Sequence, residues 1–216
     1  MSPNKFPLLI GITGNIGSGK SVFCNFLTAK GLKVISADDI ANQHLDDPEI
    51  KETLIKRYST AVLSTSRDDK TKSIINHKIL ADIVFGSDEE TKFLNSLIHP
   101  LVLQDFQRIM EQSQDEVLCF EVPLLFEANL QDCFDYIILI SASLETRLKR
   151  LEKRGEDRIK AQQRMLYQMP DTEKRHLVDL IIENDGDLVS LQKAAAALIE
   201  KIPYLQYKKV RSFVES

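Results

Sequence analysis

The sequence predicts an α/β protein with a parallel central sheet. Apolar runs of strand length alternate with segments that have helical periodicity. The first run, residues 7–13, is apolar almost throughout, as in strands that are buried on both faces of a parallel sheet. A glycine-rich turn and an amphipathic segment follow it, which is the order of a strand-to-helix crossover.

The expected elements follow in chain order. Residues 7–13 and 32–35 are predicted strands, and a helix over residues 21–30 separates them and can end at Gly31. Further strands are expected at residues 117–122, 136–140 and 179–183. Further helices are clearest at residues 101–112, 144–153 and 187–202. Residues 204–216 have weak periodicity and are expected to be helical or disordered.

Residues 48–111 contain no convincing core strand. We expect a mostly helical insertion after the second strand, with a polar, flexible stretch at residues 64–73. Within it, Pro100 suits the first turn of the helix expected at residues 101–112. On these grounds His99 and Pro100 mark a helix start.

Composition narrows the class of protein. The chain has 216 residues, of which 43% are hydrophobic, and a formal net charge of -4. A chain dedicated to nucleic acid would usually be basic. No secretory signal is visible, and no apolar run approaches the ~20 residues needed to span a bilayer. Three widely spaced cysteines without a CxxC motif indicate buried thiols in a reducing compartment. We expect a soluble cytoplasmic protein without nucleic-acid or membrane partners.

The turn after the first strand matches the phosphate-binding pattern GxxxxGK[ST] in full. Glycines let backbone N–H groups turn inward, and the helix N-terminus adds partial positive charge. Lys20 can bridge the β- and γ-phosphates, and the Ser21 hydroxyl can ligate Mg²⁺. The pattern predicts a three-layer P-loop NTPase fold that binds MgATP through Gly14, Asn15, Ile16, Gly17, Ser18, Gly19, Lys20 and Ser21.

Other motifs choose among P-loop proteins. The guanine-reading NKxD pattern of GTPases is not supplied by the sequences at Asn76 or Asn184. Helicases and motors are usually larger and carry a distinct acidic box. A small kinase is therefore favoured, and it needs a carboxylate near the acceptor hydroxyl. Asp38 follows the second strand at the edge where ligands bind in parallel sheets. From position alone, Asp38 is equally well explained as a cap of a helix at residues 40–45.

The chain resembles the dephospho-coenzyme A kinase family. The resemblance covers residues 8–200 in the family's order and is most specific at the His-Pro and Val-Pro-Leu-Leu-Phe-Glu motifs. The matching segments are Gly11 to Ser21, Ala37-Asp38, Ile83-Val-Phe85, Leu97-Ile-His-Pro100, Val122 to Glu127, Arg150-Leu-x-x-x-Arg154, Arg164-Met-x-x-Gln168 and Asp179 to Gly186.

The resemblance implies ATP-dependent phosphorylation of the ribose 3′-hydroxyl of dephospho-CoA, with ATP and Mg²⁺ required. Asp38 matches the family's base, and Lys20 completes the catalytic pair. The chain would be one P-loop kinase of three parts. These are a core of about residues 7–36, 115–142 and 178–202, a helical CoA-binding domain of about residues 37–114, and a lid of about residues 145–168. We expect a monomer, with weak self-association left open.

The resemblance also assigns side chains to the two substrates. It places Arg150, Arg154 and Asn184 at ATP. It places His99 and Arg164, with Asp38, at the acceptor. Pro123, Leu124, Phe126 and Glu127 follow a core strand and should line the ligand crevice, although Glu127 is equally well explained as a helix residue. The spacing of the lid arginines predicts one face of a continuous helix. On that face Arg147 and Arg158 are expected to be solvated and paired with the acidic residues Glu145, Glu152 and Glu156.

Some alternatives stay open. Glu121 ends a predicted strand and either reaches Mg²⁺ through water or makes a local hydrogen bond. The family often has aspartate where this chain has Ser36, and arginine where it has Asn42 and His77. These departures leave room for a kinase of the same fold acting on a nucleoside or nucleotide. A nucleotide-gated binding protein without phosphoryl transfer is the other alternative.

Overall fold

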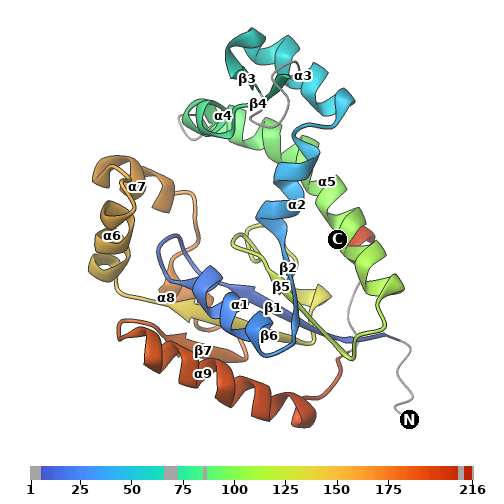
Figure 1. Ribbon diagram of the computed structural model, residues 1–216, viewed down its shortest axis with the longest axis vertical. Coiled ribbons are helices and arrows are strands. Elements are labelled where there is room, and N and C mark those ends of the chain that lie inside the picture. The colour runs from blue at the N-terminus through green and yellow to red at the C-terminus, as the bar shows by residue number, and fades with distance from the viewer. Residues whose placement is uncertain (1–5, 66–72, 85–86, 209–211, 216) are drawn as a thin grey trace. The chain divides into compact units, whose positions relative to one another are not determined.

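The computed structural model describes residues 6–65, 73–84, 87–208 and 212–215. Its central feature is a five-stranded parallel sheet in the order β2-β5-β1-β6-β7 (Figure 1). The strands are β1 (Leu8–Thr13), β2 (Lys33–Ser36), β5 (Val117–Glu121), β6 (Tyr136–Ser141) and β7 (Leu180–Glu183). All five were expected from the sequence, and the parallel arrangement is confirmed.

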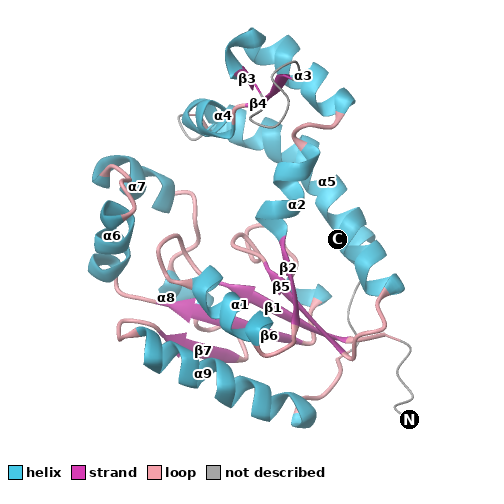
Figure 2. Cartoon of the chain, in the orientation of Figure 1, coloured by secondary structure: helices cyan, strands magenta, loops and turns pink. Residues whose placement is uncertain are grey.

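Both faces of the sheet are buried. On one face Leu8, Ile10 and Ile12 of β1 pack against helices α1 (Lys20–Ala29) and α9 (Leu188–Lys201), which lie along the same side of the sheet (Figures 1 and 2). On the other face Gly11 leaves room for Leu125 and Phe134, since a Cβ there would lie 2.8 and 3.0 Å from them. The sheet is therefore a middle layer, as the uninterrupted apolar pattern of β1 predicts.

The second face is closed by the segment between β5 and β6, which contains the short 3-10 turn η2 (Gln131–Cys133), and by the end of the chain. Phe213 is fully buried, and its ring centroid lies 5.5 Å from those of both Phe120 and Phe134. Gln107 Oε1 accepts a hydrogen bond of 3.1 Å from Phe213 N. Within the described residues, the end of the chain is therefore neither a regular α-helix nor undocked. It forms the 3-10 turns η3 (Ile202–Tyr204) and η4 (Phe213–Glu215).

The three cysteines are free and buried, as expected. Burial raises the pKa of the Cys119 thiol to about 12, and burial together with nearby Glu121 also raises that of Cys24. These thiols stay protonated and act as small apolar side chains of the core.

Residues 38–106 form a compact unit of their own. It contains helices α2 (Ala37–His44), α3 (Pro48–Tyr58) and α4 (His77–Val84), the turn η1 (Ser59–Val62), and most of α5 (Asp88–Gln112). A hairpin of β3 (Leu63–Thr65) and β4 (Ser73–Ile75) was not predicted, because three-residue strands carry almost no periodicity. Of the stretch at residues 64–73 that we expected to be flexible, residues 66–72 lie outside the described residues, as does Phe85 of one family motif.

The helix expected to begin at residue 101 begins at Asp88 instead, and Pro100 lies inside it. That prediction was wrong. Ser87 starts the helix, since its hydroxyl accepts a hydrogen bond from Glu90 N and its carbonyl accepts one from Thr91 N. Pro100 lacks an N–H, which costs the helix one hydrogen bond. Its ring is on the exposed side, where this loss is tolerated.

The segment that the sequence predicts as a lid, residues 145–168, contains two helices, α6 (Leu144–Lys153) and α7 (Arg158–Met165), with the short α8 (Asp171–Lys174) after them. The expected continuous helix through Arg158 is wrong, because α6 ends at Lys153 and Gly155 takes a left-handed φ of 83°. In the part of the chain that the structure describes, no helix combines the length and apolar character needed to cross a bilayer.

Candidate active site

The loop between β1 and α1 has a backbone conformation that strongly favours glycine at three positions. Gly14, Gly17 and Gly19 have φ values of 150°, 80° and 95°. A Cβ on Gly14 would lie 2.3 Å from Ile140 O, and one on Gly19 would lie 2.2 Å from Asn184 Nδ2. The loop therefore presents backbone rather than side chains at the start of α1, where the free N–H groups of a helix attract anions.

The far wall of this loop is fixed by residues from the lid and from the end of β7. Arg150 donates hydrogen bonds to Ser18 O at 3.2 Å and to Asn184 O at 2.8 Å. Asn184 Nδ2 donates to Ser18 O at 2.7 Å. These two predicted ATP-site residues are thus brought to the loop, and in this structure their polar groups shape it.

Lys20 and Ser21 begin α1, and both face Glu121 at the end of β5. The Ser21 hydroxyl donates a hydrogen bond of 2.8 Å to Glu121 Oε1, and Lys20 Nζ lies 4.0 Å from the same oxygen. The Lys20 side chain is only 10% exposed. The local hydrogen bond expected for Glu121 is confirmed. Hydroxyl and carboxylate oxygens are also the donors that Mg²⁺ prefers, so these residues fit a magnesium site.

Asn15 and Ile16, which were expected to bind ATP, direct their side chains elsewhere. Asn15 Nδ2 donates a hydrogen bond of 3.1 Å to Met169 O. The Ile16 side chain packs against the small apolar core of the lid, formed by Leu148, Leu151, Ala161 and Met165. The loop therefore presents Asn15 and Ile16 to the lid, while its glycines leave the start of α1 open.

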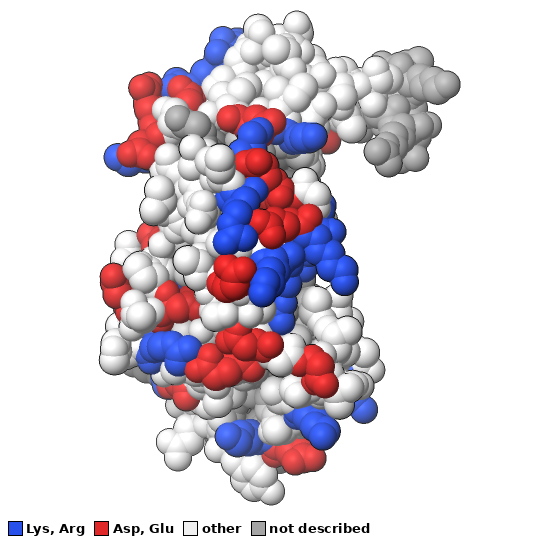
Figure 3. Space-filling model, turned by 90° about the vertical axis from the view of Figure 1, so that its left-hand side faces the viewer, with Lys and Arg blue, Asp and Glu red and all other residues white. Residues whose placement is uncertain are grey.

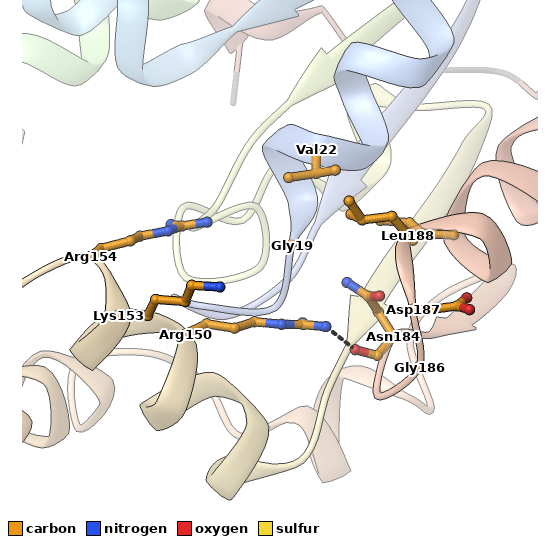
Figure 4. Close-up of a pocket in the computed structure, with 10 residues that line it drawn as sticks. Gly19, Val22, Arg150, Lys153, Arg154, Asn184, Gly186, Asp187 and Leu188 are labelled. Atoms are coloured by element: carbon orange, nitrogen blue, oxygen red, sulfur yellow. Dashed lines mark hydrogen bonds between the residues drawn. The ribbon is translucent and has the colours of Figure 1, made fainter.

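A pocket of about 500 Å³ opens beside Gly19. Lys153 at the end of α6 and Arg154, which follows it, line the pocket, and Leu188 lines it from the start of α9 (Figure 4). Its volume lies in the range typical of small-ligand sites. The complete lining is Gly19, Val22, Arg150, Lys153, Arg154, Asn184, Gly186, Asp187, Leu188 and Leu191. The pocket combines positive side chains with an apolar wall next to the phosphate loop.

The remaining lid arginines differ from each other. Arg158 pairs with Glu152 at 2.8 Å and Glu145 at 3.1 Å, as expected for a solvated face. For Arg147 that expectation was wrong, because its Nε and Nη1 atoms are buried without a hydrogen-bond partner among the described residues. Figure 3 shows positive and negative side chains interleaved on the face that carries α6 and α7. This pattern differs from the one-sign patch of a nucleic-acid surface.

Asp38 lies in the first turn of α2, and its side chain is exposed. The helix starts at Ala37, immediately after β2, so the alternative explanation of Asp38 as the cap of a helix at residues 40–45 is wrong. The helix dipole stabilises an acid at this position. Asn42 and His77, two departures from the family pattern, are exposed on α2 and α4.

The acceptor residues expected after β5 occupy a tight turn. Pro123 and Leu124 are half-buried, whereas Phe126 is 5% exposed and belongs to the core. Glu127 Oε1 accepts a hydrogen bond of 2.7 Å from Met169 N and forms an ion pair of 3.1 Å with Lys174. The turn is therefore tied to the chain that leaves the lid.

His99 and Arg164 lie in separate compact units of the chain. His99 is in the middle of α5, and burial lowers the pKa of its imidazole. Arg164 lies in the last turn of α7 and pairs with Glu156 at 2.9 Å.

Sequence reasoning missed two residues of this region. Lys174 is fully buried, although lysines are almost never buried without a partner. Gln168 Oε1 accepts a hydrogen bond of 2.9 Å from Ile16 N in the phosphate loop. Both lie in a polar stretch without periodicity. Gln168 belongs to a quoted family motif, which was the available signal.

Comparison with known proteins agrees with this geometry. The family model described as dephospho-CoA kinase matches residues 8–190. The chain is 33% identical to the dephospho-CoA kinase of Fusobacterium nucleatum, over 90% of this chain and 98% of that protein. It is also similar to a solved structure of TT1252 from Thermus thermophilus, with a TM-score of 0.74, 31% identity, and coverage of 91% and 98%.

A solved structure of dephospho-CoA kinase from Campylobacter jejuni is 27% identical, has a TM-score of 0.62 and covers 90% of this chain and 96% of that one. The family match spans both compact units, the phosphate loop and the lid. This chain belongs to the dephospho-CoA kinase family.

Proposed function

We propose that this protein transfers the γ-phosphoryl group of ATP to the ribose 3′-hydroxyl of dephospho-CoA, giving coenzyme A and ADP. The observation that carries the proposal is the glycine loop. Its backbone can approach a phosphate closely, because its glycines lie where a Cβ would collide with neighbouring atoms. Family membership supplies the acceptor, since the loop by itself is shared by many ATP-binding proteins.

The phosphate loop is proposed to bind the triphosphate of ATP, and the adjoining pocket its nucleoside. The N–H groups at the start of α1 and the buried Lys20 favour the triphosphate. The pocket beside Gly19 has room for the nucleoside, with Val22 and Leu188 as apolar contacts for the base. Arg154 reaches the same pocket from the lid, which supports its expected contact with ATP.

Mg²⁺, when bound, would neutralise charge on the β- and γ-phosphates. Ser21 offers a hydroxyl oxygen to the ion while its proton is donated to Glu121. The Glu121 carboxylate would in turn orient a water of the metal shell. Magnesium keeps several waters in such sites, so one direct protein ligand suffices.

Asp38 is proposed as the base. In the reaction, the 3′-oxygen of the acceptor forms a bond to the γ-phosphorus, the bond from that phosphorus to the bridging oxygen breaks, and ADP leaves. The acceptor proton passes to the Asp38 carboxylate. Lys20 and the lid arginines stabilise charge on the transferred group.

The acceptor is proposed to contact Pro123 and Leu124, which are half-buried, and His99 and Arg164, as the family resemblance implies. Phe126 and Glu127, which the sequence also predicts at the acceptor, would support this surface from the protein interior. The supporting observation is that Phe126 is buried and Glu127 is paired with Lys174.

An acceptor assay tests the proposal. Purified protein is incubated with MgATP and either dephospho-CoA or a panel of nucleosides, and ADP release and acceptor mass are measured. The expected result is a preference for dephospho-CoA with a mass gain of about 80 Da, one phosphoryl group. A preference for a nucleoside would reassign the acceptor, and no mass gain on any acceptor would leave a nucleotide-binding protein.

A further inference from the structure

The chain that leaves the lid is attached to the tip of the phosphate loop by two hydrogen bonds. Ile16 N donates to Gln168 Oε1 at 2.9 Å, and Asn15 Nδ2 donates to Met169 O at 3.1 Å. Asn15 is only 3% exposed. Gln168 and Met169 follow α7 directly in the chain, so they are the point where the lid returns to the core.

Because of these contacts, the amide and the side chain of Ile16 do not face the side of the loop where phosphate is proposed to bind. The Ile16 amide points at Gln168 and so does not serve as a phosphate donor in this conformation. The half-buried Ile16 side chain packs against the lid core of Leu148, Leu151 and Ala161. The loop tip is thus held by the lid through an apolar contact and through the chain after α7.

A buried ion pair fixes Met169 from the other side. Glu127 Oε1 accepts a hydrogen bond of 2.7 Å from Met169 N and pairs with Lys174 Nζ at 3.1 Å. Lys174 is 0% exposed and also donates to Pro123 O at 3.4 Å. Removing one partner of such a pair leaves an uncompensated charge, which is strongly destabilising, so Glu127 and Lys174 depend on each other.

We propose that Gln168 and the Glu127–Lys174 pair are positioning residues that hold the phosphate loop in its ATP-binding form. Gln168 fixes the loop through Ile16 N, and Glu127 fixes Gln168 by holding the next residue, Met169. Lys174 supplies the charge that keeps the Glu127 carboxylate in place. The proposal rests on the assignment of the loop to ATP, and it adds a link between that loop, the lid and the turn after β5.

The first test removes one acceptor atom. Gln168→Met keeps the length of the side chain but cannot accept the bond from Ile16 N. We expect kcat/KM for ATP to fall about tenfold, with KM for dephospho-CoA changed less than about twofold, because the acceptor does not contact the loop tip. The matched control is Gln162→Met, the same change at an exposed position of α7. Equal effects of the two changes, or ATP kinetics of Gln168→Met within twofold of wild type, would overturn the proposal.

The second test compares two double variants. Glu127→Gln with Lys174→Met and Glu127→Leu with Lys174→Met both remove the buried ion pair, so neither leaves an unpaired charge. They differ in the acceptor for Met169 N, which only glutamine retains. We expect kcat/KM for ATP of the leucine variant to lie about tenfold below that of the glutamine variant, because only glutamine still accepts a hydrogen bond from Met169 N. Identical ATP kinetics in two folded doubles would sink the positioning role of Glu127.

Calorimetric measurement of ADP binding by the same proteins distinguishes a failure of this proposal from a failure of the proposed function. If the wild-type protein fails to phosphorylate dephospho-CoA, the proposed function fails. Weaker ADP binding by Gln168→Met, at an unchanged melting temperature of the free protein, would still support the positioning role of Gln168. A lower melting temperature with unchanged ADP affinity of the folded protein would identify a purely structural role for Gln168 and would reject the proposal.

Discussion

Glu121 Oε1 lies within contact of both reactive side chains of the phosphate loop, 2.8 Å from the Ser21 hydroxyl and 4.0 Å from Lys20 Nζ. In the sheet, Glu121 is also the register partner of Ser36, the last residue of β2. The carboxylate therefore stands between the loop and the strand that leads to Asp38. It supplies negative charge at the edge of the sheet where the family often has aspartate and this chain has Ser36.

Glu121→Gln is expected to raise the Mg²⁺ concentration that gives half-maximal activity by about tenfold. Glutamine keeps an oxygen for the Ser21 hydroxyl but loses the charge, and changes of residues behind a metal ligand typically cost about 10–100-fold in affinity. A magnesium titration at saturating ATP measures this. Glu116→Gln, at the exposed residue before β5, is the control. Superimposable titrations of both variants would exclude Glu121 from the metal site.

Asp38→Asn is expected to lower turnover by at least about tenfold, because loss of a general base usually costs about 10²–10⁴-fold, while ATP binding stays nearly intact. Single-turnover kinetics and calorimetric ATP binding provide the two readouts. Asp39→Asn changes the neighbouring exposed acid of the same helical turn and should leave turnover close to wild type. Wild-type turnover in Asp38→Asn would remove it from the base role.

Gly19→Ala is expected to abolish ATP binding. The new Cβ would lie 2.2 Å from Asn184 Nδ2, and the residue has a φ of 95°. Gly31→Ala separates crowding from backbone strain, since Gly31 has a φ of 91° but no atom within 4 Å of the added Cβ. The control should lose about 1–2 kcal/mol of stability, the cost of a left-handed backbone for a residue with a Cβ, and keep ATP binding. Equal loss of ATP binding in both variants would contradict the crowding argument.

Phe213→Ala is expected to reduce the free energy of unfolding by about 3–5 kcal/mol, as for other fully buried aromatic residues. The three-ring cluster with Phe120 and Phe134 would be left with a cavity. Urea denaturation measures the change. Val214→Ala, at a side chain that is 55% exposed, should cost little. A similar small loss for both would mean that the end of the chain does not contribute to the core.

Stability should fall on acidification in part through His99. Burial lowers its pKa below the ordinary 6.5, so the folded protein favours the neutral ring. The resulting stability is present above about pH 6.5 and is lost as pH falls through the lowered folded pKa. Melting temperatures between pH 8 and 5 should drop less steeply in His99→Gln than in wild type. His176→Gln, at an exposed histidine, serves as the reference.

The sheet and the phosphate loop could be predicted because their signals are local and strong. The apolar run of β1 and the spacing of Gly14, Gly19 and Lys20 each point to one structure. The roles of Asn15 and Ile16 could not be predicted in this way. Their partners, Met169 and the lid core, lie far away in the chain, and nothing in the motif distinguishes a residue that faces phosphate from one that faces the lid.

Pro100 and Lys174 show two further limits. Proline at position 100 is a good helix start by propensity, yet the preceding residues are helical and the helix continues through it. Lys174 sits in a charged stretch that reads as surface. Its burial depends on Glu127, so only the folded chain shows that the two charges meet.

The pairing of β2 with β5 has a consequence for biosynthesis. Lys33 is opposite Leu118, and Ser36 is opposite Glu121, so the whole compact unit of residues 38–106 lies between the two partners in the chain. β2 therefore cannot find its neighbour until that unit has left the ribosome. The entropy of closing such a loop rises only slowly with its length, whereas folding slows as contacts become more distant in sequence. A nascent chain that ends before β5 leaves both β1 and β2 without the neighbour that they share, and this is the stage at which aggregation is most to be expected.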